Sequence, residues 1–366
     1  MIDWLQVVLT VRHSKQLIGG VFLSTDDEGV EEWRRIKAVT VEGSHSSKIK
    51  IASQNQCAES EWRDVYISGN PAKFLQGHNL FGSDDVLGLA AAMGRKALLL
   101  NGIFVPESVY QGWLVGEGID IKMIDITYMW RLPTQSDARA WLRAMSYSSH
   151  MRRRGRGEMV GETLYYGKRS RRWAFKFYNK FDELLSKKKG HRLPGTFDLW
   201  DWAMDKKRLL VWAEGTVRGE LRLLNMEIKR LQLDNGKLWA GLDTLKLYKH
   251  FLEGLEVAEQ SVDDQMLMSK LSGARLRAYM QWRDGVDLRS TLTKPTFYRL
   301  RRELKQYGID IAVAPAQSRE HSNVVPMLRP LVAEPCATPD FAKGRRILFE
   351  TERDRARRLR YAHDFT

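Results

Sequence analysis

A tyrosine that follows a basic hairpin offers the clearest chemistry in this sequence. Residues 161–188 read GETLYYGKRSRRWAFKFYNKFDELLSKK, in which two short apolar and aromatic runs flank a basic turn. The second run ends at Tyr178, close to Lys176 and Lys180. A phenol has a pKa of about 10 and is a weak nucleophile near neutral pH, so a nearby cation is needed to lower that pKa. The pattern favours attack of Tyr178 on a phosphodiester, with Arg172 as a third cation.

Alternatives to these roles stay open at this point. Tyr178 is also the type of residue that ends a buried strand, and Tyr165 or Tyr166 is a rival nucleophile. Lys180 either activates the phenol or holds a phosphate. Attack by a side chain instead of water would keep the phosphodiester energy in a phosphotyrosine bond, which permits later rejoining.

Two carboxylates accompany the tyrosine on predicted strands. The strongly alternating run GIDIKMIDITYMWRL places Asp125 among apolar residues on one face. An isolated buried charge is costly, so Asp125 requires a partner, either a cation or a capping role. Glu220 lies between Arg218 and Arg222 on one face of a strand predicted over 209–224. That row is either a solvated salt-bridge ladder or, if the face points into a site, a second carboxylate beside Asp125.

The elements that must position these residues form two regions. The first is β-rich, and its Gly, Asp and Ser turns favour an antiparallel meander with an ordered loop at 69–85. Helices are predicted at 86–100, with Asp84 or Asp85 as N-cap, and at 137–147. The expected early strands cover 4–11, 20–23, 36–42, 47–52 and 62–68.

Beyond about residue 225 the apolar spacing becomes helical, at 242–255 and 263–282. The segment 291–308 resembles the second helix of a helix-turn-helix, with Thr293 as cap and Pro295 early in the helix. Its apolar residues would face a core and its basic residues would face DNA, although a basic surface helix is the alternative. The core residues are Phe297, Leu300 and Leu304, and the basic ones are Arg299, Arg301, Arg302 and Lys305.

Composition points to a polyanion as partner. The chain of 366 residues carries a net charge of +14, and a field of that sign attracts nucleic acid. Two basic clusters are predicted to contact phosphate, although the first also fits a solvated loop. These clusters are Arg152, Arg153, Arg154 and Arg156, followed by Lys168, Arg169, Arg171 and Arg172.

Other features exclude several classes. Cys57 and Cys336 form neither a disulfide framework nor a metal motif, which fits a reducing cytoplasm. The sequence has no apolar run long enough to span a bilayer and no secretory signal pattern. A GxGxxG after a strand, a Walker loop, an HExxH motif and the His-hydrophobic-His pair of many nicking enzymes are all missing from it.

Several islands of sequence resemble the gene II replication initiators of filamentous phages. They occur in the family's order, beginning with MID at the start, and the resemblance covers residues 1 to about 330. The hairpin also resembles initiators of staphylococcal rolling-circle plasmids, within the HUH-like nuclease group. The islands are PAKFLQGHNLFG, IKMIDITY, AFKFYNKFDE, GTVRGELR and NVVPMLRP.

The resemblance implies an activity. Members make a site-specific nick at the plus-strand origin of double-stranded replicative DNA, and later cut and rejoin the displaced strand. A tyrosine becomes joined to the DNA 5′ end and frees a 3′-OH primer, with magnesium or manganese as cofactor. The family tyrosine corresponds to Tyr178, with Lys180 in its Tyr-x-Lys setting. Its Ile-Asp strand corresponds to Asp125 and its Arg-x-Glu strand to Glu220, although Gly219 here replaces a large apolar residue.

Because magnesium prefers oxygen ligands, Asp125 and Glu220 are the first metal candidates and His78 is a weaker one. The expected fold is α+β: an antiparallel, HUH-like nicking domain with flanking helices at 1–235, then a smaller helical, winged-helix or helix-turn-helix, DNA-binding domain at 236–315. A basic, partly disordered tail is expected at 316–366, with one charged helix near 344–360.

Expected partners are double- and single-stranded origin DNA, host helicase and DNA polymerase, in the cytoplasm of a bacterial host. A homodimer on DNA is a further expectation, and no membrane role is predicted. The alternative function is a DNA-binding regulator or origin binder that does not cleave. A conjugative relaxase is a third idea, but nothing in the sequence supports it.

Overall fold

A long antiparallel sheet forms the body of the protein. The computed structural model describes residues 1–43, 47–186, 193–194, 202–257, 271–307, 309–313, 331 and 334–363. Nine strands pair in the order β10-β11-β12-β13-β7-β1-β6-β5-β4, and every neighbouring pair is antiparallel. In that order they span Glu158–Val160, Thr163–Tyr166, Trp173–Asn179, Thr216–Leu224, Ile119–Arg131, Ile2–His13, Glu61–Gly69, Lys48–Ala58 and Val39–Glu42.

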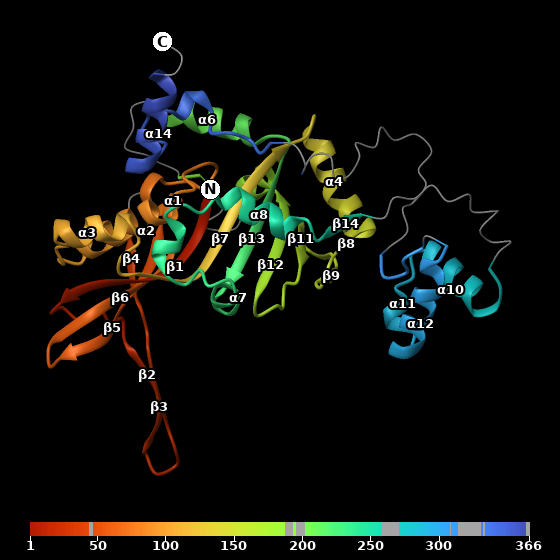
Figure 1. Cartoon of the computed structure of the whole chain (residues 1–366), viewed down its shortest axis with the longest axis horizontal. Coiled ribbons are helices and arrows are strands. Elements are labelled where there is room, and N and C mark those ends of the chain that lie inside the picture. Colours follow the sequence, from red (N-terminus) through yellow and green to blue (C-terminus); the bar gives the residue numbers. More distant parts are fainter. Residues whose placement is uncertain are drawn as a thin grey trace.

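Two small sheets accompany the large one. Strands β2 (Val21–Thr25) and β3 (Glu31–Ile36) pair only with each other and project away from the body as a hairpin (Figure 1). Strands β14 (Leu255–Val257), β8 (Ser149–Met151) and β9 (Gly155–Arg156) form the other. The sequence predicted β2, but β3 is a strand that it did not predict.

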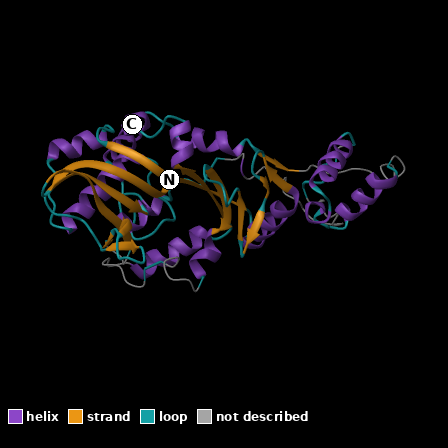
Figure 2. Cartoon of the chain, turned by 90° about the horizontal axis from the view of Figure 1, so that it is seen from below, coloured by secondary structure: helices purple, strands orange, loops and turns teal. Residues whose placement is uncertain are grey.

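Helices flank the large sheet on both faces (Figure 2). Aromatic residues of α4 (Gln135–Ser148) and α8 (Thr244–Leu252) pack against β12. Trp141 lies 5.9 Å from Phe177 between ring centroids, and Phe175 lies 5.0 Å from Tyr248. The other helices of the main body are α1 (Pro71–Gln76), α2 (Val86–Leu100), α3 (Glu107–Leu114), α5 (Lys180–Leu185), α6 (Trp202–Ala213), α7 (Asn225–Arg230), η2 (Gly236–Trp239), η3 (Asp340–Ala342) and α14 (Glu352–His363).

A second unit has a core of its own. Helices α10 (Gly273–Arg283), α11 (Leu288–Thr291) and α12 (Lys294–Lys305) lie apart from the large sheet (Figure 1). Their core includes the three α12 residues that the sequence placed inward, which are Phe297, Leu300 and Leu304. Thr293 is the N-cap residue of α12, and a proline lies in its first turn, as predicted.

Two predicted elements were wrong. The segment 69–85 was expected to be a loop, but it contains α1, where Asn70 accepts a hydrogen bond from the backbone N–H of Lys73. The strand expected over 209–224 is helix α6 followed, after a tight turn at Gly215, by β13. The predicted fold class is confirmed: an α+β protein with a large antiparallel sheet and flanking helices.

The C-terminal segment returns to the main body. Ala342 and Ile347 are fully buried in a cluster with Leu80 and Phe81 of the loop after α1, and α14 carries the charged helix predicted near this end. The predicted helix at 263–282 lies partly outside the described residues, and its described part is α10. Among the residues that the structure describes, no helix is long and apolar enough to cross a membrane.

Candidate active site

The predicted tyrosine and glutamate share one face of the large sheet. Strand pairing sets Tyr178 opposite Arg218, and Lys176 opposite Glu220. On the next strand, Glu220 lies opposite Thr127. Because alternate residues of a strand point to the same side, all of these side chains lie on one face, called here the catalytic face. The sequence predicted that Asp125 and Glu220 lie on neighbouring strands, but it did not show that their face also carries Tyr178.

Gly219 points to the opposite face, and its neighbours explain why it departs from the family pattern. A Cβ atom at this position would collide with the hydroxyl of Tyr248 and the ring of Phe177. Tyr248 comes from α8 and is fully buried. Its ring therefore occupies the space that a large side chain at 219 would need.

Tyr178 and Glu220 make a direct contact. The phenol hydroxyl of Tyr178 donates a hydrogen bond to Oε1 of Glu220, and Lys176 Nζ lies 2.5 Å from Oε2 of the same carboxylate. Tyr178 is 7% exposed and Glu220 is 1% exposed. Burial, and then the charge of Glu220, raise the pKa of Tyr178 well above its usual value. The expectation that neighbouring cations lower this pKa is therefore wrong for the closed site.

The same factors act on the carboxylate. Burial, and then the charge of Asp3, raise the pKa of Glu220, against the opposing effect of Lys176. A carboxylate whose pKa is raised holds a transferred proton more firmly, which suits a general base. Tyr178 and Glu220 thus form a buried pair in which one proton has a defined donor and a defined acceptor.

Two buried cations hold a loop over the catalytic face. Lys180 donates to Oδ1 of Asn79 at 3.1 Å and also bonds Glu183, while Arg218 donates to the backbone oxygen of Asn79. Burial lowers the pKa of Lys180 to about 8, although Glu183 acts to raise it. Asn79 belongs to the loop 77–85 after α1, so this loop closes over the site.

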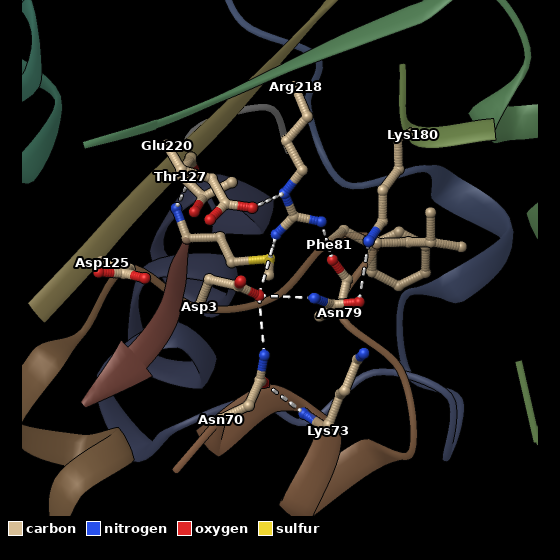
Figure 3. Close-up of polar contacts among 12 residues, drawn as sticks. Asp3, Asn70, Lys73, Asn79, Phe81, Asp125, Thr127, Lys180, Arg218 and Glu220 are labelled. Atoms are coloured by element: carbon tan, nitrogen blue, oxygen red, sulfur yellow. Dashed lines mark hydrogen bonds and ion pairs between the residues drawn. The ribbon is translucent and has the colours of Figure 1, made fainter. Parts of the chain in front are cut away.

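Asp3 joins the loop to the sheet (Figure 3). Its Oδ1 accepts hydrogen bonds from Asn70 at 2.8 Å, from Asn79 at 2.7 Å and from Arg218 at 3.1 Å. Burial alone would raise the pKa of Asp3, but Arg218 and the other cations hold it well below its usual value. Asp3 is thus a permanent anion at the centre of the network.

The sequence missed Asp3, Asn79 and Glu183 as members of the site. Two of them lay in segments already singled out: Asp3 in the opening MID and Asn79 in GHN. His78, beside Asn79, was the predicted member because its loop closely resembles that of the gene II initiators. The amide partner of a buried lysine carries no comparable signal in the sequence.

The three predicted metal ligands do not form one cluster, although Asp125 and Glu220 lie on neighbouring strands of the catalytic face. Asp125 forms a two-bond ion pair with Arg222, at 2.9 and 2.7 Å, which is the structural alternative considered above. His78 is buried and bonds the backbone oxygen of Ile347 at 2.8 Å through Nε2, while its Nδ1 accepts from the N–H of Leu80. In the described parts of the chain, no group of three or more His, Cys, Asp or Glu residues could hold a metal ion. As arranged here, these residues do not fit a magnesium site.

The C-terminal segment holds the loop from outside. Besides the contact with His78, the N–H of Phe349 donates to Gln76 at 2.8 Å, and the N–H of Cys336 donates to the oxygen of Met129 at 2.7 Å. A cavity of about 560 Å³ lies between this segment and the sheet, and Thr127 at its wall belongs to the catalytic face. The other lining residues include Phe81, Trp212 and Arg358.

Most of the predicted DNA-contacting residues are exposed. Arg153, Lys168, Arg169, Arg171 and Arg172 lie on turns at the β8–β12 end of the sheet. Arg299 and Arg302 are exposed on α12.

The remaining ones are engaged within the protein. Arg152 pairs with Glu256, and Arg154 stacks over Trp173 at 4.0 Å from the ring centroid. Arg156 is half-buried. Arg301 and Lys305 both bind Asp310, at 2.6 and 3.1 Å. Arg218 is fully buried on the catalytic face, so it is not part of the exposed basic surface.

Comparison with known proteins defines the class. Residues 1–242 match the family of the N-terminal part of the gene II replication-associated protein, and residues 264–346 match the family of its C-terminal part. The chain is 34% identical over 339 residues to the gene II replication-associated protein of Enterobacteria phage I2-2, covering 93% of this chain and 95% of that protein. A rolling circle replication initiator from Geobacillus stearothermophilus is similar over 72% of this chain and 88% of its own, with 12% identity and a TM-score of 0.31.

The chain is therefore a phage-type replication protein. It belongs to the gene II family of replication-associated proteins, and the predicted resemblance to the gene II initiators is confirmed.

Proposed function

We propose that this protein starts rolling-circle replication by nicking origin DNA with Tyr178 and later rejoins the displaced strand. One observation carries the proposal: the hydroxyl of Tyr178 donates to Glu220 on a sheet face that also bears Lys176 and Arg218. The family assignment supports replication as the process. The protein would act as a site-specific endonuclease and strand transferase in the cytoplasm of a bacterial host.

The chemistry follows from the pair. Glu220 accepts the phenol proton as Oη of Tyr178 attacks the scissile phosphorus. The new Oη–P bond replaces the bond from phosphorus to the 3′ oxygen, which leaves a 5′-phosphotyrosine and a free 3′-OH. Lys180, with a pKa of about 8, supplies the proton for the departing 3′ oxygen. Arg218 stabilises charge on the other phosphate oxygens. Rejoining is the same reaction in reverse, with a 3′-OH as attacking group.

A divalent cation stays part of the proposal as a requirement of the reaction. Magnesium or manganese would neutralise charge on the phosphate. No step above passes through the ion, because the three candidate ligands are held by other partners in this structure.

DNA binding is proposed to divide between the two units. The exposed basic turns near β8–β12 would hold the single strand, and α12 would contact the double-stranded origin through Arg299 and Arg302. Host helicase would then unwind the duplex, and host DNA polymerase would extend the free 3′ end.

The test uses supercoiled DNA that carries the cognate origin, incubated with the protein and magnesium. We expect relaxed circles with protein joined to the 5′ end, and loss of both in Tyr178→Phe. Tyr165→Phe is the matched control, because Tyr165 lies on the same face across from Lys176. Nicking by Tyr178→Phe would make the nucleophile assignment wrong. Binding without any nicking, with either metal, would favour the non-catalytic origin binder.

A further inference from the structure

The β2–β3 hairpin has no role in the reaction and no partner within the described chain. Its two strands pair only with each other and reach away from the body (Figure 1). An isolated two-stranded hairpin is at best marginally stable in water, so an arm of this kind would be stabilised by packing against a partner.

Apolar side chains are exposed on both faces of this hairpin. Val21 and Ile36 lie opposite each other on one face, while Phe22 and Trp33 share the other face. Their exposed fractions run from 44% for Val21 to 55% for Phe22. Leu23 and Val30 are exposed as well, at 56% and 59%. Exposed apolar side chains gathered in this way mark an interaction surface.

Charge is ordered along the arm. Five carboxylates fall within the seven tip residues, whereas the arm's three cations lie nearer the body. An acidic tip repels DNA phosphates, so it sets the arm apart from the rest of a chain with a net charge of +14. The carboxylates are Asp26, Asp27, Glu28, Glu31 and Glu32, and the cations are Arg34, Arg35 and Lys37.

This order is complementary to itself. If two copies of the arm lie antiparallel, each acidic tip meets the basic base of the other. Phe22 and Ile36 lie beside the cations of the base, and Leu23 and Trp33 lie between base and tip. A two-fold contact requires this kind of self-complementary surface. We propose that the β2–β3 hairpin is a dimerisation arm, and that its partner is the same hairpin of a second copy of this chain.

The test is charge reversal with the full-length chain, followed by sedimentation equilibrium with and without origin DNA. The tip variant carries Asp27→Lys and Glu28→Lys, and the base variant carries Arg35→Glu and Lys37→Glu. Asp26 is left intact because its Oδ1 accepts from two backbone N–H groups of the turn.

Each variant alone should weaken self-association by about tenfold or more. In the tip variant the two new lysines face Arg35 and Lys37 of the other arm, and in the base variant the two new glutamates face its acidic tip. An equimolar mixture of the two variants should form a heterodimer, because the lysines placed at 27 and 28 then face the glutamates placed at 35 and 37, while the unchanged tip faces the unchanged base. Trp33→Ser with Phe22→Ser should give a monomer. As a control with the same change in net charge as the tip variant, Glu59→Lys with Glu253→Lys should dimerise like the parent.

Two results would overturn the proposal: a parent protein that is monomeric at every concentration with and without DNA, or a mixture that does not recover dimers. Thermal melting shows whether each variant is folded. Cleavage of a single-stranded origin oligonucleotide should stay unchanged in all of them, since the arm lies outside the catalytic face. Loss of dimerisation through the arm and loss of the proposed nicking activity are therefore measured separately.

Discussion

Replacing Glu220 with glutamine removes the proposed base while the shape of the site is kept. The amide oxygen of the glutamine still accepts the hydrogen bond of Tyr178, but it does not take up the proton. An ordinary phenol with a pKa of about 10 is ionised in only about one molecule in a thousand at pH 7. Burial raises the pKa of Tyr178 further. We therefore expect Glu220→Gln to cleave about 10³-fold more slowly, equal to about 4 kcal/mol in activation free energy.

The assay is single-turnover cleavage of a single-stranded origin oligonucleotide between about pH 6 and pH 9. The rate of Glu220→Gln should rise about tenfold per pH unit up to about pH 8, because only the ionised phenol attacks when no base takes its proton. Above that pH the rise should level off, since Lys180 loses the proton that it donates. The parent rate should not follow this slope. Glu227→Gln is the matched control, since Glu227 is equally buried but pairs with Arg230 on α7, at 2.5 Å.

Two outcomes contradict the reasoning. A Glu220→Gln protein that keeps its rate at pH 7 to within about tenfold would show that Glu220 is not the base. A slow variant with no dependence on pH would indicate that the substitution disturbs the geometry instead of the proton transfer. Thermal melting beside the control separates these cases from unfolding.

Three further predictions concern the surroundings of this pair. Cleavage by the parent should fall as pH rises through about 8, where Lys180 loses its proton. Glu183→Gln should move this fall to lower pH, because Glu183 raises the pKa of Lys180. If both proteins have the same pH profile, Lys180 is not the acid. Chelation of divalent cations should abolish cleavage and leave origin binding in a gel-shift assay, and full activity in chelator would end the metal requirement. Met129→Cys, made with Cys57→Ser, should form a disulfide with Cys336 that holds the C-terminal segment closed. Cleavage should stop on oxidation and return on reduction. An oxidised protein that remains active would show that the segment stays in place during cleavage.

The carboxylates of the catalytic face were predictable because strand parity is written in the sequence. Alternation in β7 and β13 placed Asp125 and Glu220 on defined faces of their strands, whereas Tyr178 was singled out by the basic hairpin before it. Which residue pairs with which was not predictable, because register depends on how β13 aligns with both neighbours. That alignment places Arg222 beside Asp125, so the candidate metal ligand Asp125 is engaged in an ion pair.

The wrong elements have local causes. The last turns of α6 carry an apolar run, LLVW, whose short length fits a strand or a buried helix equally well. Pro71 and Gly77 indicated a loop, yet a proline in the first turn and a glycine at the C-cap are also the ends of a short helix, α1. The arm strand β3 has six exposed residues and no buried face to give it a pattern.

The closed site is compatible with the proposed reaction because the groups that hold the loop 77–85 over the site can also bind a phosphate. Lys180 and Arg218 both donate to oxygen atoms of Asn79, one in its side chain and one in its backbone. A scissile phosphate presents charged oxygens, which are stronger acceptors than an amide, to the same two donors. Under the proposed function, DNA therefore replaces Asn79 as partner of both cations, and the loop opens without leaving either charge unpaired. The bond from Asn79 to Asp3 and the contacts of His78 and Gln76 with the C-terminal segment would still have to break for the loop to open.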